Sequence, residues 1–190
     1  MATATLSALC DTAGSLLVLV DIQNRLVAAM PEESANLLLR NGTILLQAAA
    51  LLNIPVLVSE QSPGKLGGTV ASITQHLPRT AQPCAKTSFS CYGSVEFRDA
   101  LAAHGRRQII LAGMETHVCV LQSALELHAS GLQVFVIEDA VCSRTQANTS
   151  NALARMREAG ITISNTESVL FEWLRNAVHE HFKQIATLIR

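Results

Sequence analysis

The chain alternates short runs of apolar residues with longer stretches in which apolar residues recur at helical spacing. The runs are continuous, as in LLVLV at 16–20, and this is typical of parallel strands buried on both faces. They predict six strands, at 16–20, 55–59, 84–87, 107–112, 133–137 and 161–164, of which the third is the weakest. The alternation therefore indicates repeated βαβ units and a parallel sheet.

The amphipathic stretches between these runs predict the crossover helices. We expect helices at 34–52, near 70–76, from an N-cap at Ser94 to 104, from the 113–124 junction to about 131, and at 143–159. Ser143, with Gln146 three residues later, is typical of a capping box at the start of the last of these helices. Segment 168–190 predicts two short helices, and 1–14 a loose arm or a short lead-in helix.

These elements predict an α/β fold: a three-layer α/β/α, doubly wound, six-stranded parallel sheet of Rossmann-like order 3-2-1-4-5-6. With 190 residues we expect one domain over 1–190, with its core at about 16–164 and the C-terminal helices at 168–190. Ligands of such sheets bind where the strand order reverses, between strands one and four. Asp21 ends the first strand, Cys119 follows the fourth, and Lys86 lies at the end of the third, so we expect all three at this switch point.

Cys119 is the candidate nucleophile because the stretch 113–124, GMETHVCVLQSA, joins a strand to a helix. Unpaired N–H groups and the helix dipole at such a junction favour a thiolate. We therefore expect Cys119 to be alkylated at pH values below the ordinary pKa of a thiol. The other cysteines, Cys10, Cys84, Cys91 and Cys142, are expected to be structural, since the five cysteines are odd in number and contain no C-x-x-C pair.

Four blocks of the sequence, over about 16–164, resemble the isochorismatase-like cysteine hydrolases, which include nicotinamidases and carbamoyl-amide hydrolases. The blocks are LLVLVDIQ ending at Gln23, KTSFS at 86–90, GMETHVCV at 113–120 and GLQVFVIEDAVCSR at 131–144. The resemblance implies that Cys119 is the nucleophile, Asp21 the general base and Lys86 the cation that steadies the thiolate. It also implies a cis peptide at Met114-Glu115, with the N–H groups of Glu115 and Cys119 as the oxyanion hole. The implied reaction is hydrolysis of a small carboxamide through a thioester.

Two departures from the family narrow this expectation. Nicotinamidases carry an Asp-x-His metal site after the second strand, where this chain reads Ser59-Glu60-Gln61, so we predict no metal and no cofactor. Enzymes that cleave the vinyl ether of isochorismate usually lack the cysteine, so Cys119 favours hydrolysis of a C–N bond. Candidates for lining the substrate pocket are Gln23, Leu26, Glu60, Phe89 and Tyr92, although core packing explains the two aromatic residues equally well.

The charge and hydrophobicity of the chain limit the kinds of partner that we expect it to bind. A net charge of −1 gives no electrostatic reason to expect nucleic acid or an anionic membrane, and the apolar runs are too short to span a bilayer. With no basic secretory or transit segment at the start, we expect a cytoplasmic protein. A hydrophobic content of 49% with 15% charged residues favours a homo-oligomer. Two other functions stay open: a binding or scaffold module with a vestigial triad, and an isochorismatase-type vinyl ether hydrolase.

Overall fold

The computed structural model describes residues 8–190 as one sheet of six parallel strands in the order β3-β2-β1-β4-β5-β6. This confirms the predicted fold class and strand order. The strands are β1 (Ser15–Val20), β2 (Val56–Gln61), β3 (Cys84–Lys86), β4 (Gln108–Met114), β5 (Gln133–Cys142) and β6 (Thr162–Ser164).

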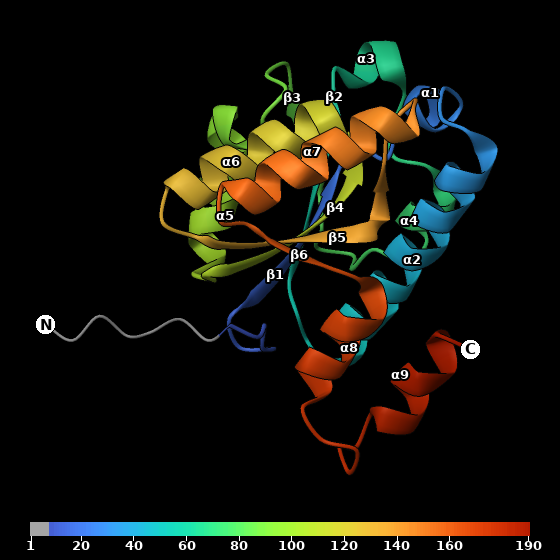
Figure 1. Ribbon diagram of the computed structural model, residues 1–190, viewed down its shortest axis with the longest axis vertical. Helices are drawn as coiled ribbons and strands as arrows, with labels where there is room; N and C mark the ends of the chain where they lie inside the picture. Colours follow the sequence, from blue (N-terminus) through green and yellow to red (C-terminus); the bar gives the residue numbers. More distant parts are fainter. Residues whose placement is uncertain (1–7) are drawn as a thin grey trace, which may run out of the picture.

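Helices cover both faces of the sheet (Figure 1). One face carries α2 (Glu32–Leu51), α4 (Ala71–Thr74), α8 (Thr166–Leu174) and α9 (Phe182–Leu188). The other face carries α5 (Val95–His104), α6 (Leu121–Ala129) and α7 (Gln146–Glu158). The connections hold the shorter α1 (Asn24–Val27), α3 (Pro63–Leu66), the 3-10 turn η1 (Cys91–Gly93) and the π-helical turn η2 (Thr116–Val120).

The central strand β1 shows why the apolar runs are continuous. All six of its residues are buried, and successive side chains enter opposite cores: Leu17 and Leu19 pack against the α2 side, whereas Leu16 and Val18 pack against the α5–α7 side. A strand covered on both faces has no solvent side, so its apolar residues run without a break from Leu16 to Val20.

Several boundaries differ from the sequence predictions. Strand β5 continues to Cys142, which leaves Ser143 beside the His117 ring at 3.0 Å from Oγ to Nδ1 instead of at a helix start. The N-cap of α7 is Thr145, whose hydroxyl accepts from the Asn148 N–H, so the predicted capping box at Ser143 is wrong. The Ser94 N-cap of α5 is confirmed. Residues 8–14 form bends and turns without a helix, and the rest of the predicted N-terminal arm lies outside the described residues.

The sheet register brings the carboxyl ends of β1, β2 and β4 together. Val20, the last residue of β1, pairs with Ser59 on one side and with Gly113 on the other. Gly113 has a φ of +130° and approaches Val20 so closely that a Cβ atom there would lie 2.1 Å from the Val20 carbonyl oxygen. Only glycine allows the switch point to close.

We therefore expect Gly113→Ala to lower the free energy of unfolding by more than about 2 kcal/mol, because backbone atoms must move apart. Urea denaturation measures the change. Gly64→Ala is the matched control, since a Cβ atom at Gly64 meets nothing within 4 Å. Equal stability of the two variants would contradict this account of the switch point.

Candidate active site

The three residues predicted to form the site lie together at the switch point. The Lys86 ammonium is 2.6 Å from Asp21 Oδ2, and both side chains are completely buried. Cys119, which is 6% exposed, lies near enough to Asp21 for this carboxylate to raise the pKa of the thiol. Asp21 therefore contacts the cation and acts on the thiol at the same time.

Lys86 is surrounded by oxygen atoms. Besides Asp21, its ammonium donates to Gln61 Oε1 at 2.9 Å, to the Phe89 carbonyl at 2.9 Å and to the Ser88 carbonyl at 3.3 Å. Strand pairing explains the first contact, because Gln61 and Lys86 are register partners at the ends of β2 and β3. A buried ammonium is tolerated only with a counter-ion and acceptors of this kind.

Asp21 is also held at its second oxygen. The Ser59 hydroxyl donates to Oδ1 at 2.7 Å, and the Asp21 backbone N–H donates to the Ser59 carbonyl at 3.1 Å. The backbone of Asp21 is left-handed, with a φ of 52°, a conformation that aspartate tolerates better than most residues. Both carboxylate oxygens thus have donors, and the side chain has little freedom to rotate.

Cys119 lies in the π-helical turn η2, which continues directly into α6. The predicted cis peptide at Met114-Glu115 is confirmed. The Glu115 carbonyl accepts from the N–H groups of Val118, at 3.1 Å, and Val120, at 3.2 Å, and so closes the turn. The nucleophile candidate is thereby fixed at the end of β4.

The protonation state of Cys119 differs from the expectation. Burial and, after it, the Asp21 charge raise the pKa of the Cys119 thiol to about 12, and the nearby Lys86 only partly opposes them. The thiol is therefore neutral near pH 7, and the prediction of a thiolate favoured by the helix start is wrong. A neutral thiol beside a carboxylate is arranged to give up its proton during attack rather than before it.

Two of the candidate pocket residues hold a loop. The Gln23 amide, fully buried, donates to the carbonyls of Gly67 at 2.6 Å and Gln61 at 3.1 Å, while its oxygen accepts from the Gln61 N–H. Glu60 Oε1 accepts from both the N–H and the hydroxyl of Thr69, each at 2.7 Å. These side chains therefore form hydrogen bonds with the segment that contains α3.

The other three candidates are less enclosed. Phe89 is 53% exposed although its carbonyl binds Lys86, so its ring lies at the surface next to the site. Tyr92 is partly buried, and the Arg98 guanidinium stacks over its ring at 5.8 Å. Leu26 is partly buried against the core on the α2 side.

A second polar cluster lies beside the cis peptide and was missed by the sequence reasoning. The Glu115 carboxylate is 3.0 Å from Arg144 Nε and 3.6 Å from His117 Nδ1, and the His117 ring also contacts Asn148 at 3.4 Å. Its residues come from the ends of β4 and β5, from η2 and from α7, and the pairing of β4 with β5 brings them together.

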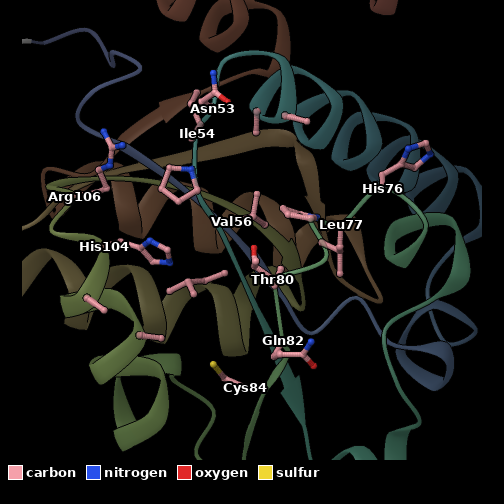
Figure 2. Close-up of a pocket in the computed structure, with 18 residues that line it drawn as sticks. Asn53, Ile54, Val56, His76, Leu77, Thr80, Gln82, Cys84, His104 and Arg106 are labelled. Atoms are coloured by element: carbon pink, nitrogen blue, oxygen red, sulfur yellow. The ribbon is translucent and has the colours of Figure 1, made fainter.

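A pocket of about 970 Å³ lies away from these clusters, around the first residues of β2. Figure 2 shows His104 and Arg106 on one of its sides and His76 and Leu77 on another. It contains neither Asp21, Lys86 nor Cys119.

Two kinds of feature are absent from the part of the chain that the structure describes. No group of three or more His, Cys, Asp or Glu side chains in residues 8–190 is arranged to hold a metal ion, and the metal-free site stays a prediction. None of the helices in the same residues has the length and hydropathy needed to cross a bilayer.

The strand order and the polar residues at its switch point define a Rossmann-like α/β protein. A family model, the isochorismatase domain, matches residues 15–168, and the chain belongs to the isochorismatase family and has its hydrolase fold. "Isochorismatase domain-containing protein 2" of Danio rerio is 35% identical over 180 residues, which cover 94% of this chain and 88% of that protein.

Two solved structures resemble the chain over nearly its full length. The structure named MAR1 ribonuclease from Caenorhabditis elegans has a TM-score of 0.89 at 31% identity and covers 96% of this chain and 92% of its own. The YcaC gene product of Escherichia coli, described as an octameric hydrolase of unknown specificity, has a TM-score of 0.86 at 26% identity, with 98% and 91% covered.

We expect opposite effects on Cys119 alkylation when the two charges beside it are removed. Asp21→Asn removes a group that raises the Cys119 pKa, so alkylation by iodoacetamide at pH 9 should become at least about tenfold faster. Lys86→Met removes the charge that lowers the same pKa, so alkylation should become about tenfold slower. Peptide mass mapping separates Cys119 from the other cysteines, and circular dichroism checks the fold of each variant. Equal rates in all three proteins would contradict the electrostatic coupling.

Proposed function

We propose that this protein is a metal-independent cysteine hydrolase that cleaves the C–N bond of a small carboxamide through a thioester. The observation that carries the proposal is the position of Asp21, which contacts the Lys86 ammonium and acts on the Cys119 thiol inside a buried site. Such a carboxylate can take a proton from the thiol and return it to the leaving group.

In the first half of the reaction, the Cys119 sulfur attacks the amide carbon while its proton passes to Asp21. Lys86 offsets the negative charge that develops on the sulfur. The backbone N–H groups of Glu115 and Cys119 donate to the oxyanion, and a donor of this kind contributes a factor of about 100 to 1,000 to the rate. The proton then moves from Asp21 to the nitrogen, the C–N bond breaks, and ammonia or an amine leaves.

In the second half, a water molecule gives a proton to Asp21 and attacks the thioester carbon. The C–S bond breaks, the carboxylic acid leaves, and Asp21 returns the proton to the Cys119 sulfur. Because Asp21 accepts and returns one proton in each half, the site ends in its initial state and needs neither a metal nor a cofactor.

We propose that the substrate lies between the Lys86 loop and the segment that contains α3. Phe89 and Leu26 supply apolar contacts there, since Phe89 is half exposed next to Lys86. Gln23 and Glu60 act by holding the loop, because their polar atoms bind Gly67 and Thr69. Tyr92 shapes the wall behind Phe89.

Two further parts of the proposal concern partners. We propose a homo-oligomer, supported by the apolar composition and by the octameric description of the E. coli neighbour. We propose no nucleic acid partner, although the C. elegans neighbour is named a ribonuclease, because a net charge of −1 gives no electrostatic reason to expect binding to a phosphate backbone. The cytoplasm remains the proposed location.

The test is ammonia release from a panel of small carboxamides and carbamates, with a metal chelator present. We expect wild type to release ammonia and Cys119→Ala to be slower by at least about 1,000-fold, because the nucleophile is lost. Cys84→Ala is the control, since Cys84 is half-buried at the opposite end of β3 and should keep its activity.

Other outcomes identify the alternatives. Turnover of a vinyl ether that survives Cys119→Ala would support the isochorismatase reaction. Release of nucleotides from RNA by wild type would support a ribonuclease. No turnover of any compound, with Cys119 alkylation insensitive to Asp21→Asn, would leave a binding or scaffold module.

A further inference from the structure

A chain of buried hydrogen bonds ends at Asp21 Oδ1, whereas Lys86 contacts Oδ2. The Ser59 hydroxyl donates to Asp21 Oδ1 at 2.7 Å, and the Cys91 thiol donates to the Ser59 oxygen at 3.3 Å. Both Ser59 and Cys91 are completely buried. Cys91 is therefore closed to solvent, and its sulfur supports the site from behind.

A further hydrogen bond links Cys91 to α6, the helix that continues from the turn containing Cys119. The Cys91 backbone N–H donates at 2.8 Å to the hydroxyl of Ser123, which is fully buried in α6. Ser123 follows Cys119 by four residues on a continuous helical path, so the two lie on the same face. The hydrogen bonds form a chain that runs from Ser123 through Cys91 and Ser59 to Asp21.

The hydrogen bonds of this chain have a direction. Burial and the Asp21 charge raise the pKa of the Cys91 thiol to about 11, so this thiol is neutral and can donate its proton to Ser59. Because Ser59 Oγ accepts from Cys91, its own hydrogen is directed at Asp21. Lys86 holds the other carboxylate oxygen, which leaves Asp21 fixed from two sides.

We propose that Ser59 and Cys91 are positioning residues for Asp21: together they aim its carboxylate at the Cys119 thiol. This inference rests on the function proposed above. The two residues act through Asp21 and touch neither the substrate nor the reacting atoms.

The first experiment compares Ser59→Ala with Ser59→Thr, which keeps the hydroxyl. We expect Ser59→Ala to lower kcat about 10- to 100-fold, because the base is misplaced, while KM stays within about twofold. Ser59→Thr should recover most of the loss. Ser15→Ala is the matched control, because Ser15 is an equally buried serine whose hydroxyl accepts from Trp173 Nε1 at the far end of β1. A kcat in Ser59→Ala equal to that of Ser15→Ala would overturn the proposal.

The second experiment isolates the Cys91 donor. Cys91→Ser and Cys91→Ala both remove the sulfur and differ only in a hydroxyl. We expect kcat to be at least about fivefold higher in Cys91→Ser, since only that variant can donate to Ser59. Equal kcat values in the two variants would show that Cys91 only fills space. They would overturn the proposal that Cys91 positions Asp21 through Ser59.

A third measurement needs no substrate and so separates this inference from the proposed function. Without the Ser59 donor, the Asp21 carboxylate turns away from the Cys119 thiol and raises its pKa less, so alkylation of Cys119 at pH 9 should become about threefold faster or more. Ser15→Ala should leave the rate unchanged. If wild type releases no ammonia but this rate rises as expected, the proposed function fails and the positioning survives. An unchanged or lower rate in Ser59→Ala overturns the positioning itself.

Discussion

The buried ion pair between Asp21 and Lys86 is the interaction on which the rest of the site depends. Removing two charges from water costs several kcal/mol per ion, and their attraction offsets this only when further hydrogen bonds satisfy the remaining donors and acceptors. The ends of β2 and the loop after β3 supply those bonds, through Ser59 and Gln61 and through the carbonyls of Ser88 and Phe89. The short strand β3 thus completes the sheet and also places the Lys86 ammonium at the switch point.

The fold and the position of the three central residues were predictable because they follow from coarse rules. Continuous apolar runs such as 16–20 identify strands covered on both faces, and right-handed crossovers leave few possible strand orders. Once β1 and β4 are neighbours, Asp21 and Cys119 must share one edge of the sheet. Lys86 was harder to place from the pattern alone, because β3 has only three residues.

Other features depend on quantities that the sequence does not display. Ser59 meets Asp21 because the register pairs Ser59 with Val20, and Cys91 meets Ser59 only through the loop before α5. The state of the Cys119 thiol depends on competing energies. A helix start stabilises an anion by about 0.3 to 1 kcal/mol, whereas one pKa unit corresponds to about 1.4 kcal/mol, so burial and Asp21 outweigh it. The cap of α7 at Thr145 follows from the length of β5, which the apolar pattern underestimates.

The most direct test of the central claim, that Cys119 carries the acyl group under the control of Asp21, is partitioning by hydroxylamine. Hydroxylamine added during turnover competes with water for a thioester, forms a hydroxamate and releases the Cys119 thiol. Wild type should form hydroxamate at the expense of the carboxylic acid, whereas Asp21→Asn and Cys119→Ala should form neither. Ammonia release by wild type with no hydroxamate at any hydroxylamine concentration would mean that water attacks the amide directly, and would contradict the account.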